Sequence, residues 1–275
     1  MTHHAVHRIV AFSQAVLSRS ACAWFASGLL AVSVSALAAP QLWVDDSAGR
    51  LGKVDVSTGT VNIVGNMGVV MADIAFDPVG HLFGIAGGKL YSINSGNAAV
   101  TVIGSLGATV NSLVFGSDGT LYAANNLLYT VNTTTGAATA LGNVTSGYTS
   151  AGDLAFVGGE LFLSSTGRAT DSLFKLNTTT GIGTRVGSLG VSAVYGLASD
   201  DGASLYAVSG NTIYLVNPVT GATSAPLNFA GQGLSQTFGT TFLTDAAPVP
   251  EPGSSALMLA GLAVVGLMVY RRRGS

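Results

Sequence analysis

The stretch Leu128-Tyr129-Thr130-Val131-Asn132-Thr133-Thr134-Thr135-Gly136-Ala137-Ala138-Thr139-Ala140-Leu141-Gly142 decides the fold of this chain. It combines an aromatic and β-branched run, a turn from Asn132 to Gly136, and a returning run. The Asn side chain can accept backbone N–H groups further into the turn, and the Gly can adopt the left-handed conformation that lets the chain return. The stretch therefore predicts a β-hairpin.

This hairpin recurs four more times along the chain. The other copies are Leu51–Gly59, Leu90–Gly96, Leu173–Gly181 and Ile213–Gly221. With the opening copy included, the turn glycines are separated by 37, 40, 45 and 40 residues. A period of about 40 residues that contains several short strands is typical of the blades of a β-propeller.

A second repeated pair of strands fills the gaps between the hairpins. Each pair has a mostly apolar strand, a turn, and a second strand. In every copy the second strand begins with Leu followed by an aromatic residue. The copies are Asp73–Phe76 with Leu82–Gly84, Ser112–Phe115 with Leu121–Ala123, Asp153–Phe156 with Leu161–Leu163, and Gly196–Ala198 with Leu205–Ala207. Each period thus holds four strands, the number in one propeller blade.

The two ends of the repeat complement each other. Residues 238–243 match the first strand of a period but have no Leu-aromatic partner after them, and Leu42-Trp43-Val44 supplies such a partner at the other end. We predict that residues 41–45 pair antiparallel with 238–243, in one sheet with 50–55 and 60–64, because this removes an exposed sheet edge. The predicted fold class is all-β, a five-bladed β-propeller closed by N- and C-terminal strands in one blade. An irregular β-sandwich and a solenoid are the alternatives.

Residues 1–38 are predicted to be an N-terminal signal peptide. A region with two arginines precedes the apolar run Ala23–Val32, and Ala36-Leu37-Ala38 is a cleavage site of the A-x-A type. The only cysteine, Cys22, lies within this segment. Disulfide and thiolate chemistry are therefore excluded from the mature chain.

Residues 246–275 differ sharply from the propeller predicted over residues 39–245. A Pro-rich linker leads into Ser254–Tyr270, which is apolar and uncharged. As a helix this stretch would be roughly 25 Å long, enough to cross the apolar core of a bilayer. The sequence thus predicts a C-terminal transmembrane helix over about 254–270, with the arginines 271–273 remaining cytoplasmic.

The order of a Pro-Glu-Pro tripeptide, an apolar helix and an arginine cluster resembles the PEP-CTERM sorting signal of Gram-negative bacteria. The residues that carry the resemblance are Pro250, Glu251, Pro252, Arg271, Arg272 and Arg273. The resemblance implies recognition by an exosortase, a membrane-embedded processing enzyme, and members of the family are commonly linked to exopolysaccharide and biofilm production. It implies export through the inner membrane, anchoring there before sorting, and then a cell-surface or extracellular location. A plain C-terminal anchor is the alternative.

Asp73 and Asp153 are the best polar candidates in the predicted propeller. Both open an innermost strand, at a position where the other periods have Ser112, Gly196 and Gly239. Since innermost strands line the axis of a propeller, the two carboxylates are expected to line the channel. There they would either hold a cation or bond backbone N–H groups of a neighbouring blade. We favour the second interpretation because only two of five blades carry the acid, and we predict no metal and no cofactor.

Other chemistry is sparse in residues 39–245. The 12 acidic and 6 basic residues argue against nucleic-acid binding, which requires a basic face. His81 is the only histidine there, and neither a catalytic triad nor a metal-ligand spacing can be built without it. The adjacent acids Asp45 and Asp46 would face opposite sides of a strand, so they are a poor acid/base pair.

These observations predict an exported, exosortase-sorted surface or matrix protein, associated with the membrane through its C-terminal helix. Its propeller is expected to have a non-enzymatic binding or structural role, with exopolysaccharide as a partner. The alternatives are a propeller lyase or hydrolase that acts on matrix polysaccharide, and a cation- or ligand-binding propeller that uses Asp73 and Asp153.

Overall fold

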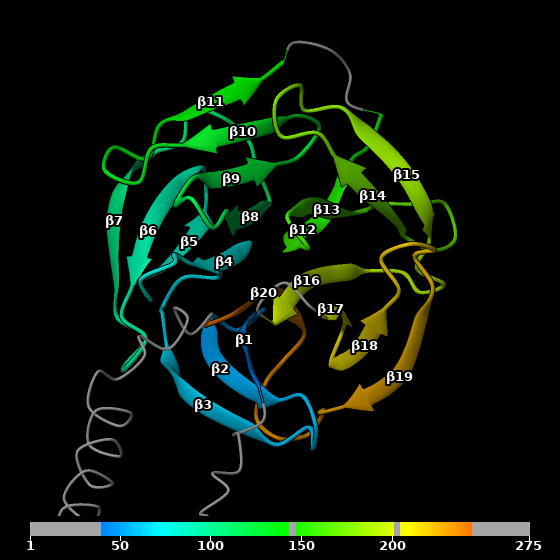
Figure 1. The fold of residues 1–275 in the computed structure, drawn as a ribbon. Helices are drawn as coiled ribbons and strands as arrows, with labels where there is room; N and C mark the ends of the chain where they lie inside the picture. Colours follow the sequence, from blue (N-terminus) through cyan, green and yellow to red (C-terminus); the bar gives the residue numbers. More distant parts are fainter. Residues whose placement is uncertain (1–39, 143–146, 201–203, 244–275) are drawn as a thin grey trace, which may run out of the picture. The chain divides into compact units, whose positions relative to one another are not determined.

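The computed structural model describes residues 40–142, 147–200 and 204–243 of the chain. Over these ranges the chain forms five antiparallel sheets of four strands each, which stand around a common axis as propeller blades (Figure 1). The predicted signal peptide and the predicted tail lie outside these ranges. Within them, no helix is long and apolar enough to cross a membrane.

Four blades consist of strands that are consecutive in the chain, and the first strand of each of these blades is the innermost. Blade 2 contains β4 (Asp73–Phe76), β5 (Leu82–Ala86), β6 (Lys89–Ile93) and β7 (Val100–Ser105). Blade 3 contains β8 (Ser112–Phe115), β9 (Leu121–Ala124), β10 (Leu128–Val131) and β11 (Ala138–Leu141). Blade 4 contains β12 (Ser150–Val157), β13 (Glu160–Ser165), β14 (Ser172–Leu176) and β15 (Gly183–Ser188). Blade 5 contains β16 (Val194–Asp200), β17 (Ser204–Ser209), β18 (Thr212–Val216) and β19 (Thr223–Asn228).

Blade 1 joins strands from the two ends of the repeat. From the innermost outward it contains β20 (Thr237–Phe242), β1 (Gln41–Asp46), β2 (Arg50–Asp55) and β3 (Val61–Asn66). β20 pairs antiparallel with β1, with Leu42 opposite Phe242 and Val44 opposite Thr240. The five-bladed propeller and its closure within one blade are therefore confirmed, and the sandwich and solenoid alternatives are wrong.

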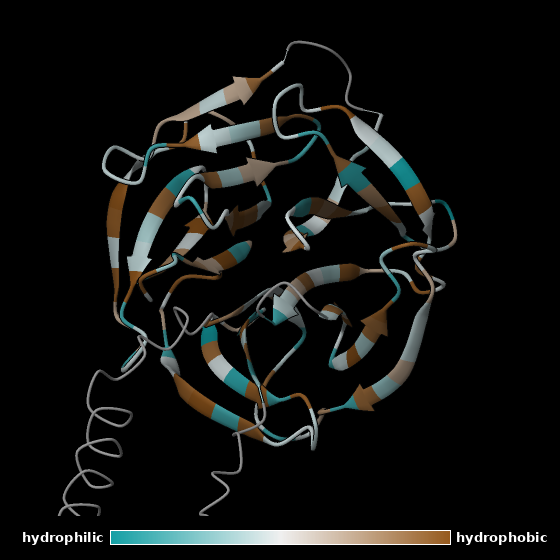
Figure 2. Cartoon of the chain, viewed as in Figure 1, coloured by the Kyte–Doolittle hydropathy of each residue, from teal (hydrophilic) through white to brown (hydrophobic). Residues whose placement is uncertain are grey.

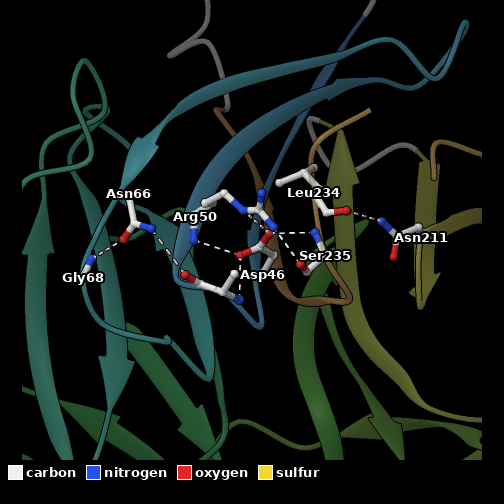
Figure 3. A network of polar contacts seen from close by, with 8 residues as sticks. Asp46, Arg50, Asn66, Gly68, Asn211, Leu234 and Ser235 are labelled. Carbon is white, nitrogen blue, oxygen red and sulfur yellow. Dashed lines mark hydrogen bonds and ion pairs between the residues drawn. The ribbon is translucent and has the colours of Figure 1, made fainter. Parts of the chain in front are cut away.

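A polar network fixes the segment that leads into β20 (Figure 3). The buried carboxylate of Asp46 accepts the backbone N–H of Ser235 at 2.8 Å and pairs with the Arg50 guanidinium at 2.9 Å. Arg50 also donates to Ser235 Oγ at 2.6 Å. The neighbouring Leu234 carbonyl accepts from Asn211 Nδ2 in the β17–β18 turn at 3.3 Å. The segment is thus tied to blades 1 and 5 at once.

Hydrophobic side chains fill the space between each pair of neighbouring blades. Each of the five interfaces holds one buried cluster, and along the strands hydrophobic bands alternate with polar ones (Figure 2). At four interfaces an aromatic residue of one blade packs against a Phe of the next blade's innermost strand, with ring centroids 5.1–5.6 Å apart. These pairs are Trp43–Phe76, Phe83–Phe115, Tyr122–Phe156 and Tyr206–Phe242. The repeated Leu-aromatic pattern therefore encodes packing between blades.

At the periphery, a glycine in or just after an outer strand packs against the hairpin turn of the next blade. We call these four contacts the rim joints; their glycines are Gly65, Gly104, Gly142 and Gly187. A Cβ atom at Gly104 would overlap the Thr135 carbonyl, and one at Gly187 would overlap the Thr220 carbonyl. The turns are themselves rigid, because Asn132 Oδ1 accepts the N–H groups of Thr134 and Thr135, each at 2.9 Å. The joint therefore accepts only glycine.

Candidate functional site

The innermost strands bring one repeated position to the axis. Asp73 in β4, Ser112 in β8 and Asp153 in β12 have no exposed surface. Blades 5 and 1 have Gly196 and Gly239 at this position. A Cβ at Gly239 would overlap the Asp73 side chain, and one at Gly196 would lie 2.5 Å from Thr240 Cγ2. The centre of the ring is therefore packed: this position contributes three side chains to it, and the two glycines leave room for the side chains of Asp73 and Thr240.

Asp153 joins three innermost strands through one carboxylate. Its Oδ2 accepts the backbone N–H of Leu197 in β16 at 2.7 Å. The same oxygen accepts the hydroxyl of Thr240 in β20 at 2.9 Å and the Thr240 N–H at 3.2 Å. Its Oδ1 accepts the N–H of Leu154 at 2.6 Å. Hydrogen bonds from backbone and hydroxyl donors thus occupy both oxygens.

Asp73 plays the same part between blades 2 and 3. Its Oδ2 accepts the Leu113 N–H of β8 at 2.6 Å, and its Oδ1 accepts the Ile74 N–H at 2.7 Å. These bonds to a neighbouring blade are the ones expected from the second interpretation of the sequence. Among the residues that the structure describes, no three His, Cys, Asp or Glu side chains are arranged to hold a metal ion.

Asp45 is a third buried acid at the axis, although the sequence pattern placed it only beside Asp46 on a strand. Its Oδ1 accepts the Gly239 N–H at 2.8 Å, and its Oδ2 is buried without a hydrogen-bond partner. Asp46 faces the other way, into the polar network with Arg50 and Ser235. The expectation that these adjacent acids diverge is therefore correct. Aligning the repeats could have revealed Asp45, because it is the only acid at its position. The other Leu-aromatic strands have Ile85, Ala124, Ser164 and Val208 there.

The three acids have strongly altered proton affinities. Burial raises the pKa of Asp45 well above its usual range, against the effect of the Gly239 N–H, and the charge of Asp153 raises it further. Burial also raises the pKa of Asp73, together with the charge of Asp153 and the side-chain hydrogen bond between the two acids. Burial raises the pKa of Asp153 in turn, partly offset by its bond from the Leu197 N–H. The axis therefore holds protons at pH values where an exposed aspartate is ionised.

No positive side chain neutralises these acids from the innermost strands. β4, β8, β12, β16 and β20 contain no Lys, Arg or His. His81 lies away from the cluster on an exposed turn, where its Nδ1 is 2.9 Å from Asp77 Oδ2. The six residues of the predicted sorting motif, Pro250, Glu251, Pro252, Arg271, Arg272 and Arg273, lie outside the described residues.

The chain resembles solved structures at the level of fold alone. The crystal structure of the nidogen/laminin complex aligns with a TM-score of 0.52 and 11% identity, over 74% of this chain and 97% of that one. A structure from a study of the de novo evolutionary emergence of a symmetrical protein aligns with a TM-score of 0.50 and 17% identity, over 73% and 93%. A gluconolactonase from Xanthomonas campestris aligns with a TM-score of 0.47 and 15% identity, over 73% and 79%.

Sequence comparison identifies the C-terminal segment. No curated protein matches the chain. The family model for the PEP-CTERM protein-sorting motif matches residues 248–273, which include the Pro-Glu-Pro tripeptide and the arginine cluster. The expected sorting signal is thus confirmed, and the chain joins a five-bladed β-propeller to a C-terminal PEP-CTERM protein-sorting motif.

Proposed function

We propose that this protein is sorted by an exosortase to the cell surface or extracellular matrix, where its propeller has a non-enzymatic role in binding or supporting exopolysaccharide. The sorting motif at residues 248–273 carries the proposal, since it implies export and anchoring in the membrane before processing. The N-terminal segment, residues 1–38, has the composition of a signal peptide, which agrees with export.

The axis supports a non-enzymatic role. A general acid or base must reach its substrate, whereas Asp45, Asp73 and Asp153 have no exposed surface. The bonds of Asp73 and Asp153 to neighbouring innermost strands give these side chains a structural task. Their raised pKa values therefore follow from their place in the ring.

Replacing Glu251 with Ala tests the sorting step. The variant should still insert in the membrane, because the apolar stretch is untouched, but its tail should remain unprocessed, so the chain should accumulate in the membrane fraction at full length. Glu160→Ala removes an acid from the propeller surface and should be processed normally. Normal processing of the Glu251 variant would contradict the exosortase assignment.

The binding role needs a second measurement. Full-length protein should sediment with the secreted exopolysaccharide of the producing cells and should release no new reducing ends or unsaturated products from it. Release of such products would favour the alternative, a polysaccharide hydrolase or lyase. Failure to sediment would remove the polysaccharide from the proposal.

A further inference from the structure

Blade 4 combines two connections that are longer than those of most other blades. The β13–β14 connection spans residues 166–171, whereas the β5–β6, β9–β10 and β17–β18 connections have two or three residues. The β11–β12 connection spans residues 142–149 and is as long as the β19–β20 connection, whereas the β3–β4, β7–β8 and β15–β16 connections have five or six residues. The 45-residue spacing in the repeat arises here. The repeat is therefore enlarged twice at one blade.

The described parts of these two connections are bonded to each other. Ser165 Oγ donates to the Thr149 carbonyl at 3.0 Å, and the Thr149 N–H donates back to Ser165 Oγ at 3.2 Å. The Thr166 N–H donates to the same Thr149 carbonyl at 2.9 Å. These bonds hold the wall of a pocket of about 470 Å³, within the range of roughly 300–1,000 Å³ that is usual for small-molecule sites.

The pocket combines three kinds of side chain. Thr149, Ser165, Thr166 and Ser172 contribute hydroxyl groups. Tyr148 and Phe174 contribute aromatic rings whose centroids are 6.2 Å apart. Tyr148 is fixed because it is buried and its hydroxyl donates to the Gly181 carbonyl at 3.2 Å. An apolar surface beside several hydroxyl groups suits a sugar ring, which has an apolar face and a polar edge.

Arg185 adds a positive charge to this pocket. It lies opposite Phe174 in the β14–β15 ladder, and its Nε donates to Ser172 Oγ at 3.2 Å, which orients the guanidinium group. Over the described ranges no carboxylate forms an ion pair with it. The matching positions in β3 and β7 are Ile63 and Val102, so the arginine is a feature of blade 4.

A second pocket on blade 4, of about 490 Å³, is less suited to a charged ligand. Its lining includes Lys175 and Glu160, whose charges neutralise each other across 2.8 Å. The first pocket is the one in which a positive group is available to a ligand.

We propose that the pocket formed by Tyr148, Ser172, Phe174 and Arg185 binds a carboxylated saccharide. The planar guanidinium of Arg185 matches the two oxygens of a uronate carboxylate, the hydroxyl groups bond the sugar's own hydroxyls, and the ring of Phe174, which packs on buried Tyr148, contacts its apolar face. This inference rests on the proposed function in one respect, since the polysaccharide role selects a saccharide among carboxylated ligands.

Titration calorimetry of the full-length protein in detergent tests the inference, with trigalacturonate as the probe and neutral maltotriose in parallel. The wild type should bind trigalacturonate at least about tenfold more tightly than maltotriose, and Arg185→Gln should weaken trigalacturonate binding by about tenfold or more, which corresponds to roughly 1.4 kcal/mol. Lys89→Gln is the matched control, because it removes the same exposed charge from blade 2 and should leave binding unchanged.

Two further measurements make every outcome informative. Thermal unfolding of Arg185→Gln should match the wild type, and Thr166→Val should also weaken binding, so a folding defect in one variant does not decide the result. Equal binding by Arg185→Gln and wild type, or no trigalacturonate binding by wild type, would overturn the pocket assignment. If wild type still sediments with secreted exopolysaccharide in that case, the proposed function survives; if it does not, both fail.

Discussion

The rim joints and the axis join the same five blades in different ways. At the rim, one contact recurs: a glycine of one blade meets the turn of the next, as at Gly104 with Thr135 and at Gly187 with Thr220. At the axis, the equivalent positions hold Asp, Ser, Asp, Gly and Gly, so only Asp73 and Asp153 make the same contact there, each with a backbone N–H of the following blade. The periphery is periodic and the centre is not.

The difference follows from geometry. Each rim joint involves only two blades, so the same contact can be repeated at four of the five interfaces. At the axis all five blades meet in a space too small for five equal side chains, so a side chain on one strand requires a glycine on another, as Asp73 requires Gly239. The repeated rim joints therefore connect neighbouring blades, whereas the axis is filled by residues that differ from blade to blade.

Removing residues 39–46 should have the largest effect, because it opens the blade that closes the ring and removes an acid from the axis. The deletion takes away β1, the partner of β20, as well as Asp45 and Asp46. Two blade edges then remain unpaired, which favours aggregation. Size-exclusion chromatography should show aggregates and the cooperative thermal transition should be lost, whereas deletion of residues 246–250 should preserve both the elution volume and the transition.

A methyl group at one rim joint should have the next largest effect. Gly104→Ala places a Cβ against the Thr135 carbonyl and the Gly136 backbone, which cannot move aside as a side chain would. We expect a loss of about 2–3 kcal/mol in the free energy of unfolding, measured with denaturant. Gly107→Ala is the control: its Cβ meets nothing within 4 Å, and its φ of +67° costs about 1 kcal/mol. Equal losses would mean that the rim contact is not tight.

The axis should make stability depend on pH. Since the pKa values of Asp45, Asp73 and Asp153 are raised by burial, the folded state binds more protons than the unfolded state. The stabilisation is complete below the unfolded pKa of about 4 and is lost as pH rises through the folded values. The melting temperature should therefore be higher at pH 5 than at pH 8.

The matched variant Asp73→Asn should flatten this dependence. The amide keeps an oxygen for the Leu113 N–H and can donate to Asp153 without titrating. Asp73→Ala should instead lose about 1–3 kcal/mol, because it leaves that N–H without an acceptor. A pH dependence in Asp73→Asn as steep as that of the wild type would show that other groups cause it.

Calcium should have the smallest effect. The oxygens of Asp73 and Asp153 already accept hydrogen bonds from Leu113, Leu197 and Thr240. A cation would have to displace these donors and separate the strands. Differential scanning calorimetry with and without millimolar calcium should give the same melting temperature; a rise that Asp73→Asn abolishes would make the axis a cation site.

Most of the fold could be predicted from the sequence because each blade uses the same local chemistry. The turn around Asn132 and Gly136 and the Leu-aromatic strands recur at a near-constant spacing, and the unpaired segments at the two ends match each other. Strand pairing then follows from the four-strand repeat, and the register between Leu42 and Phe242 confirms it.

The candidate sites were less predictable because they depend on contacts between blades. Asp73 and Asp153 could be found, since they occupy a repeated position, but Asp45 reaches the axis from a second strand that is apolar or small in the other blades. Arg185 replaces an apolar residue in a single repeat, so its meaning depends on the two enlarged connections beside it. The sequence shows where blade 4 differs from the other repeats. Only the folded structure shows that these differences lie around one pocket.

The pairing of β1 with β20 also sets the order in which the protein can fold. Leu42 and Phe242 are partners across almost the entire length of the propeller sequence. Bringing together residues so distant has a high entropic cost, and topologies rich in such contacts fold slowly. Blades 2 to 5 contain only consecutive strands and can form as the chain emerges, but blade 1 must wait for its last strand. Until β20 arrives, β1 has an open edge, so an exported chain is most exposed to misassembly just before the ring is complete.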